Sequence, residues 1–157
     1  MDLRGGSDIS PPETKGIDAV DENYVLEDQI GFLLRLASQR HGTIFQANAI
    51  DGITPTQFSA LIKISDVGEC SQNHLGRLAG MDVATIKGVV DRLGNKGLVK
   101  SRPDPEDKRR VLVSLSKEGN ALAAEMKKAG QAITADTLEP LSAQEQKTLL
   151  KILRKIS

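Results

Sequence analysis

The stretch Ser71–Gly119 decides the fold, and it reads SQNHLGRLAGMDVATIKGVVDRLGNKGLVKSRPDPEDKRRVLVSLSKEG. Ser71 is a suitable N-cap for a short helix, and Gly80 can take the left-handed conformation that ends one. Asp82 then caps a second helix, whose apolar residues recur at the spacing of one buried helical face. They are Ile86, Val89, Val90 and Leu93. This order predicts a helix-turn-helix whose second helix covers Asp82–Asn95.

Two strands joined by a charged loop follow the second helix. Leu98–Arg102 and Arg110–Leu115 each show apolar residues in rough alternation, which is typical of strands. The loop PDPEDKR contains two prolines and three acids, so the chain must turn there. Arg109 and Arg110 follow at the tip of this hairpin, where an arginine can enter a narrow minor groove. Asp107 lies on the same side of the ribbon and could hold the Arg109 guanidinium in place.

The second helix has small, hydroxylated and cationic residues opposite its apolar stripe, which suit close approach to bases and phosphates. A solvated helix face has the same composition, and it is the hairpin that favours DNA binding. We expect Ala84, Thr85 and Lys87 to face the major groove. Ser71, Gln72 and Arg92 would hold phosphates. The predicted DNA-binding residues are Ser71, Gln72, Ala84, Thr85, Lys87, Gly88, Arg92, Asp107, Arg109 and Arg110.

The stretch resembles the winged helix-turn-helix of the MarR family of bacterial transcription regulators. The matching motifs are VDRL at 90–93, KGLV at 96–99, and DKR at 107–109 followed by VLVSLSKEG. With its flanking helices, the resemblance covers roughly residues 24 to 156. It implies a homodimer that binds a palindromic operator in double-stranded DNA, as a ligand-responsive repressor. A two-fold dimer fits half-sites about 10 base pairs apart.

The resemblance also assigns roles within the stretch. It implies that Asp82–Asn95 is the recognition helix and that Arg109 is the wing-tip arginine. Gly88 departs from the pattern, since many relatives place a longer polar residue near that point.

The whole chain is predicted to be mainly α-helical with a small β-hairpin wing, as a winged helix-turn-helix plus a helical dimerisation region. Residues 1–22 are expected to form a mobile acidic arm. Residues 23–157 would form one domain. In it, 54–115 make the winged lobe and the helices of 24–48 and 117–156 make the dimer. Thr54 and Ser142 each begin a capping box, at the start of a helix.

Composition restricts the possible functions. The 157 residues carry no net charge, but between Glu69 and Lys117 ten Lys and Arg face six Asp and Glu, so positive charge concentrates on the proposed DNA surface. No apolar run reaches the length of a membrane span, and a single cysteine fits a reducing cytoplasm. We find no phosphate-binding glycine loop and no nucleophile elbow, so we expect neither an enzyme nor a cofactor.

A ligand site is suggested by His41, which interrupts an apolar helical stripe beside Arg40. It is either a core histidine that bonds a backbone carbonyl or a polar group in a pocket for an anion. In the MarR family, effectors often lie between the dimerisation helices and the DNA-binding lobe. RHGTIFQ and the helix-turn-helix resemble members that control breakdown of aromatic acids, which implies an aromatic carboxylate or its coenzyme A thioester. The predicted ligand residues are Arg40, His41, His74 and Arg77, with Arg77 alternatively a phosphate contact.

Three alternatives remain open from the sequence. Cys70 directly precedes the helix-turn-helix and could make the protein redox-responsive, although no second cysteine is present to resolve an oxidised thiol. Cys70, His41 and His74 could bind a metal, but their spacing resembles no zinc site, and we predict no metal. The fold could also serve as a protein-interaction module that does not bind DNA, which zero net charge would suit.

Overall fold

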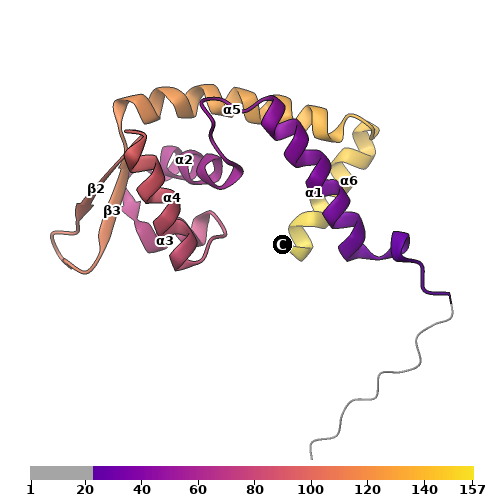
Figure 1. The fold of residues 1–157 in the computed structure, drawn as a ribbon, viewed down its shortest axis with the longest axis horizontal. Helices are drawn as coiled ribbons and strands as arrows, with labels where there is room; N and C mark the ends of the chain where they lie inside the picture. Colours follow the sequence, from indigo (N-terminus) through magenta and orange to yellow (C-terminus); the bar gives the residue numbers. More distant parts are fainter. Residues whose placement is uncertain (1–22) are drawn as a thin grey trace, which may run out of the picture. The chain divides into compact units, whose positions relative to one another are not determined.

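The computed structural model describes residues 23–157, and the predicted acidic arm lies outside the described residues. The chain divides into two units, with the boundary between residues 35 and 36. Within the described range, no helix is both long and apolar enough to cross a bilayer. The elements are η1 (Leu26–Asp28), α1 (Ile30–Ala47), α2 (Pro55–Val67), β1 (Cys70–Ser71), α3 (Gln72–Leu78), α4 (Val83–Asn95), β2 (Val99–Pro103), β3 (Val111–Leu115), α5 (Lys117–Leu138) and α6 (Ala143–Ile156) (Figure 1).

The core of the second unit lies where α2, α3 and α4 pack together and α5 runs along α2 (Figure 1). The apolar stripe predicted for the second helix is buried in this core, since Ile86, Val89 and Leu93 are fully covered. Leu61 from α2 and Leu75 from α3 are also fully covered. The helix-turn-helix is therefore confirmed, with the recognition helix beginning one residue after its predicted cap.

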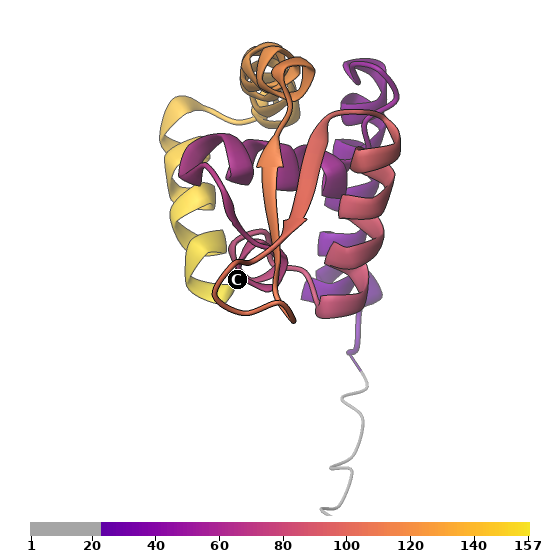
Figure 2. The same cartoon turned by 90° about the vertical axis from the view of Figure 1, so that its left-hand side faces the viewer.

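The wing belongs to a three-stranded antiparallel sheet in the order β1-β3-β2. The two hairpin strands lie within one residue of their predicted bounds, and Val99 pairs with Leu115. The third strand, β1, in which Cys70 pairs with Val113, was not predicted. Two residues are too short for an alternation pattern, and this strand exists because β3 offers it a free edge. Figure 2 shows the hairpin beside α4.

Side-chain caps begin the helices where the sequence predicts them. The Asp82 carboxylate accepts from the Thr85 backbone N–H at 2.7 Å, and the Ser71 hydroxyl accepts from that of His74 at 3.3 Å. Both predicted capping boxes are present, with Gln57 and Glu145 as the returning side chains. Each cap satisfies a backbone N–H that has no partner within its helix, which sets where the helix starts.

The start of the first helix was predicted wrongly. A single helical pattern was expected over Tyr24–Asn48, but α1 begins at Ile30 after the short η1. Gln29 separates them with an extended backbone, at φ −84° and ψ 131°. The apolar residues before Gln29 keep helical spacing although the backbone there is not α-helical, so periodicity alone placed the start of the helix six residues too early.

The junction between the wing and α5 is a single residue, Ser116. Its hydroxyl donates to the Gly97 carbonyl at 2.7 Å and accepts from the Gly119 backbone N–H at 2.9 Å. Its own N–H donates to the Leu98 carbonyl at 3.0 Å. Gly119 is so close to Leu98 that a Cβ built on it would overlap the Leu98 carbonyl oxygen. The start of α5 is therefore held tightly against the turn after α4.

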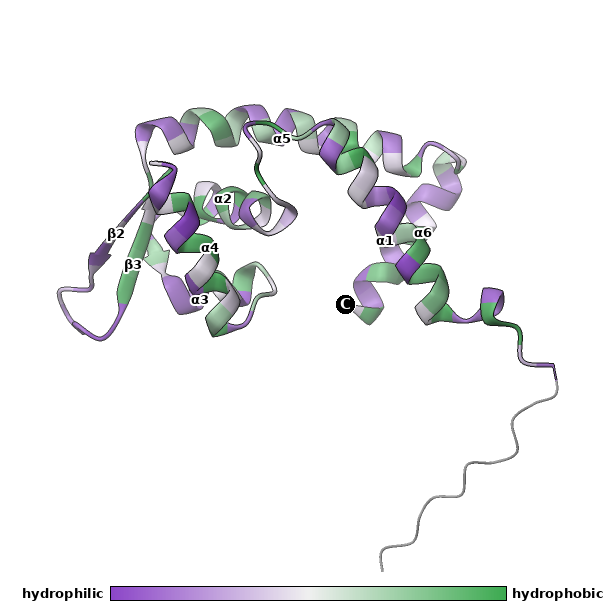
Figure 3. Cartoon of the chain, viewed as in Figure 1, coloured by the Kyte–Doolittle hydropathy of each residue, from purple (hydrophilic) through white to green (hydrophobic). Residues whose placement is uncertain are grey.

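Apolar surface is uncovered in each unit. None of the fourteen residues of α6 is buried, and Ile152 and Ile156 are 50% and 63% exposed. Figure 3 shows that α6 carries both hydrophobic and hydrophilic positions. In the first unit Tyr24 and Ile30 are 59% and 65% exposed. Surface of this kind on several helical turns is typical of an interface with another chain.

Candidate DNA-binding surface and ligand cavity

The exposed face of α4 carries the residues predicted to contact bases. Ala84, Thr85 and Lys87 are exposed, and the Lys87 ammonium pairs with Asp91 one turn later at 2.8 Å. Val83 is also 65% exposed at the first position of the helix, and the sequence analysis missed it. A valine there offers apolar contact to a thymine methyl group. Its position outside the buried apolar stripe could have indicated from the sequence that Val83 is exposed.

Gly88 and Arg92 form a second feature of α4. A Cβ built on Gly88 would lie 3.5 Å from Arg92 Nη2, so the guanidinium folds back along the helix over the glycine. Arg92 therefore presents its N–H groups beside the middle of α4, where a backbone phosphate could accept them.

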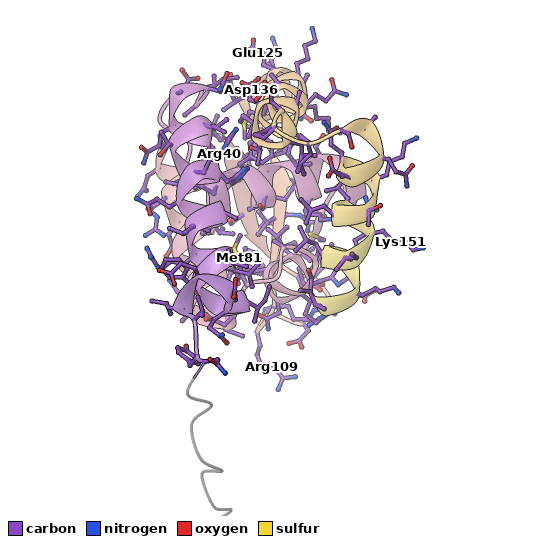
Figure 4. The ribbon with its side chains drawn as sticks, turned by 90° about the vertical axis from the view of Figure 1, so that its right-hand side faces the viewer. Arg40, Met81, Arg109, Glu125, Asp136 and Lys151 are labelled. Carbon is purple, nitrogen blue, oxygen red and sulfur yellow. The ribbon has the colours of Figure 1, made fainter. Side chains whose placement is uncertain are left out.

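The wing tip is built around the pair of Asp107 and Arg109. Asp107 Oδ1 accepts from Arg109 Nε at 3.0 Å and from its backbone N–H at 3.1 Å, and Oδ2 lies 3.3 Å from Nη2. The Arg109 side chain is nonetheless 91% exposed. Figure 4 shows it projecting away from the rest of the protein. The acid fixes the direction of the guanidinium while leaving most of it free to contact a partner.

Asp104 and Arg110, on either side of the wing tip, hold the loop in shape. Asp104 is buried, accepts from the Glu106 backbone N–H at 2.9 Å and lies 3.6 Å from Arg110 Nε. Backbone bonds from Asp104 to Arg110 and from Arg110 to Asp107 close the turn. Arg102 on β2 donates to Glu69 at 2.9 Å, which ties the hairpin to the segment before β1. Acids on this surface thus position the cations.

A hollow of about 370 Å³ lies between α3 and the wing. Arg77 lies here and is therefore brought together with Arg109 and Arg110. It also lies 3.4 Å from His74 Nδ1. Three arginines around one hollow suit a phosphate. Its lining residues are Ser71, Gln72, Asn73, Arg77, Arg109, Arg110 and Val111, of which Asn73 and Val111 were not predicted.

The wing carboxylates are held in their charged form. The hydrogen bond from the Arg109 side chain, followed by that from its backbone N–H, lowers the pKa of Asp107. The hydrogen bond from Arg102 lowers the pKa of Glu69. A lowered folded-state pKa means that these contacts stabilise the fold fully above the ordinary carboxyl values of about 4. That stabilisation is lost as the pH falls through the lowered values, so both pairs persist at neutral pH.

Replacing Asp107 with asparagine separates positioning from charge. The variant keeps an oxygen for the Arg109 backbone N–H but loses the charged contact to its guanidinium. We expect weaker binding to operator DNA, because the Arg109 guanidinium is no longer held in one orientation. Binding to a scrambled duplex should become slightly tighter, because each subunit gains one unit of positive charge. Fluorescence anisotropy on both duplexes measures this; tighter binding to both would show that Asp107 only screens charge.

The second cavity, of about 220 Å³, is where the structure places His41. His41 is exposed at its edge, and its Nδ1 lies 3.0 Å from Thr137 Oγ1, so its partner is a hydroxyl rather than a backbone carbonyl. Arg40 donates to the Asp136 carbonyl at 3.2 Å (Figure 4) and is not part of the lining. His74 and Arg77 lie on α3 and are not brought together with His41. The cavity is lined by His41, Phe45, Pro55, Phe58, Ser59, Gly130, Ile133 and Thr134.

Aromatic rings shape this cavity. Phe45 and Phe58 meet edge to face, with ring centroids 5.7 Å apart. A Cβ on Gly130 would lie 2.8 Å from Phe58 Cζ, so the glycine lets the ring approach α5. The result is a small, largely apolar space with a few polar atoms, as ligand pockets usually are.

The surroundings of Cys70 do not favour a redox sensor. Burial raises the pKa of its thiol, and the negative charge of Glu69 raises it further. The reactive thiolate is therefore scarcer than for a free cysteine. Among the residues that the structure describes, no three His, Cys, Asp or Glu side chains gather in a way that could hold a metal ion.

Comparison with known proteins agrees with this geometry. Residues 53–111 match the MarR family. The chain is 40% identical over 134 residues to the HTH-type transcriptional repressor NicR of Pseudomonas putida, covering 85% of each. The chain belongs to the MarR family. A probable transcriptional regulator from Pseudomonas aeruginosa has 49% sequence identity and a TM-score of 0.81 over 85% of this chain and all of that one.

A MarR-type structure with a known ligand is also similar. BpsR of Bordetella bronchiseptica, whose DNA binding is regulated by 6-hydroxynicotinic acid, has 38% identity and a TM-score of 0.80, covering 85% of this chain and 96% of BpsR. The family match spans α2 to the start of β3 and so includes both α4 and the wing tip. The protein is thus a MarR-type winged-helix regulator, and these relatives are transcription regulators rather than enzymes.

Proposed function

We propose that the protein represses transcription as a homodimer on a palindromic operator and is released by a small aromatic carboxylate. The observation that carries the proposal is the wing tip: Arg109 is 91% exposed yet aimed by Asp107. An exposed guanidinium held in one direction is suited to a narrow, electronegative minor groove.

The DNA contacts follow from the same surface. In the major groove α4 would present Val83, Ala84 and Lys87 to base edges, with Lys87 donating to guanine O6 or N7. Arg92 over Gly88 and the hollow around Arg77 would receive phosphates. Acids on the surface are engaged with cations or caps, as Asp91, Asp104 and Asp107 illustrate. Zero net charge therefore does not prevent binding, because local pairing leaves the cations facing outward.

Dimerisation is supported by the uncovered apolar residues. The face of α6 and the first unit each expose hydrophobic side chains that a second copy could cover. An isologous dimer would present two α4 helices to successive major grooves, which is the arrangement a palindrome needs.

The His41 cavity is the proposed effector site. Its volume of about 220 Å³ suits a single substituted ring packed against Phe45 and Phe58. BpsR supports this class of ligand, since 6-hydroxynicotinic acid regulates its DNA binding. A coenzyme A thioester would have to leave its nucleotide portion outside a space of this size.

The proposal is tested by anisotropy with a duplex from upstream of the protein's own gene and a scrambled duplex of equal composition. At physiological salt we expect binding to the first to be about a thousandfold tighter or more. Adding 6-hydroxynicotinate should release the specific complex. Equal affinity for both duplexes would contradict sequence-specific binding and favour a protein-interaction module.

A further inference from the structure

Helical hydroxyls at the His41 cavity direct their protons to backbone carbonyls. Ser59 Oγ donates to the Pro55 carbonyl at 3.0 Å, and Thr134 Oγ1 donates to the Gly130 carbonyl at 2.8 Å. A carbonyl oxygen has no proton, so the hydroxyl must be the donor in each contact. Each hydroxyl oxygen is left with a lone pair and without a proton for any other partner.

The same reasoning fixes the tautomer of His41. The Thr137 hydroxyl donates to the Ile133 carbonyl at 2.7 Å, so it can only accept from His41 Nδ1, 3.0 Å away. The proton of the neutral ring must then be on Nδ1. Nε2 carries a lone pair, and it has no hydrogen-bond partner among residues 23–157.

The side chains that line the cavity therefore offer acceptors and no free donor. Ser59, Thr134 and the neutral His41 ring supply lone pairs, and the rest of the lining is apolar or glycine. A carboxylate is only an acceptor, so burying it here would leave it without a hydrogen bond, at a cost. A ligand hydroxyl or ring N–H would be satisfied.

We infer that the cavity selects aromatic ligands by a hydroxyl or ring N–H donor that points inward, with the carboxylate left toward solvent. This rests on the proposed role of the cavity as the effector site. It makes Nε2 of the neutral His41 ring a hydrogen-bond acceptor for the ligand, because Thr137 fixes the ring proton on Nδ1.

The tautomer can be tested without any ligand. The chain has two histidines, so ¹⁵N-imidazole NMR of the full-length protein gives signals from two rings, each with an Nδ1 and an Nε2, and a His74→Gln variant assigns them. At about pH 8.5 we expect the neutral His41 ring to carry its proton on Nδ1. Replacing Thr137 with valine should shift His41 toward the Nε2–H form. A wild-type His41 protonated on Nε2 would overturn the inference.

Ligand selection is tested with 6-hydroxynicotinate, nicotinate and 6-methoxynicotinate, all of which carry the same carboxylate. The first has a proton to donate in either of its tautomers, and the other two have none at the ring or substituent. By calorimetry we expect 6-hydroxynicotinate to bind roughly tenfold tighter or more than either analogue. Equal binding of all three would overturn the inference. No binding by any of them would instead refute the proposed effector class and leave the tautomer experiment as the test of the cavity.

Variants connect the selectivity to the named atoms. Thr134→Val and His41→Phe keep approximate shape and remove one acceptor each, so the preference for 6-hydroxynicotinate over 6-methoxynicotinate should shrink in both. Thr43→Val is the matched control, because Thr43 also donates to the carbonyl four residues earlier, at 3.2 Å, but does not line the cavity. An unchanged preference in the Thr134 and His41 variants would contradict the inference.

Discussion

Replacing Arg109 with glutamine is expected to weaken operator binding by about 100-fold for the dimer, since each subunit loses a contact of roughly 1–3 kcal/mol. The side chain is 91% exposed, so the change should leave the fold intact. The slope of log affinity against log salt should also fall in magnitude by about 2, one unit for each subunit. Anisotropy titrations over a salt series measure both quantities.

Lys128→Gln is the matched control for Arg109. It removes one positive charge from an exposed position on α5, away from the wing. If Arg109 acted only through non-specific electrostatic attraction to DNA, Arg109→Gln and Lys128→Gln would lower the affinity and the salt slope by the same amount. An Arg109 variant with unchanged affinity and slope would show that the wing tip does not contact DNA.

Replacing Gly119 with alanine is expected to lower the free energy of unfolding by about 3 kcal/mol or more. The new Cβ would overlap the Leu98 carbonyl oxygen and lie 3.0 Å from its carbon. Both are backbone atoms, so no side-chain rotation relieves the overlap. Either α5 or the turn after α4 must move, which also disturbs the bonds of Ser116. Thermal unfolding at fixed protein concentration should show a fall of roughly 10 °C.

Gly94→Ala tests whether the loss is specific to this contact. Gly94 is also helical, and a Cβ there meets nothing within 4 Å. Alanine should therefore be neutral or raise stability by about 0.5–1 kcal/mol, because it reduces the conformational freedom of the unfolded chain. Similar destabilisation by both substitutions would mean that the close approach of Gly119 to the Leu98 backbone does not cause the loss of stability.

The predictable parts of the fold depend on short-range chemistry. Asp82, Ser71 and Thr54 cap helices through residues three positions later, and the stripe of Ile86, Val89, Val90 and Leu93 repeats within one helix. Caps and periodicity are visible in any window of ten residues. The pairing of Asp107 with Arg109 was also predictable, since the two residues are only two positions apart in the sequence.

The features that were missed depend on distant partners. His41 finds Thr137 across 96 residues, and Cys70 pairs with Val113 on β3. Nothing local to His41 indicates that its partner is a hydroxyl, because that partner is supplied by the packing of a later helix. The grouping of Arg77 with Arg109 and Arg110 rather than with His41 likewise depends on which way α3 turns in the core.

The one-residue junction at Ser116 has a mechanical consequence. A flexible linker would let the winged helix-turn-helix tilt independently of α5. Here three hydrogen bonds of Ser116, and Gly119 packed against the Leu98 backbone, fix the two rigidly to each other. A displacement of α5 should therefore move α4 and the β2–β3 hairpin together as one rigid body. In a dimer this changes the distance between the two α4 helices and leaves the structure of each winged helix-turn-helix unchanged. Inserting one base pair between the operator half-sites should then change the ratio of the affinities with which the effector-free and the effector-loaded protein bind.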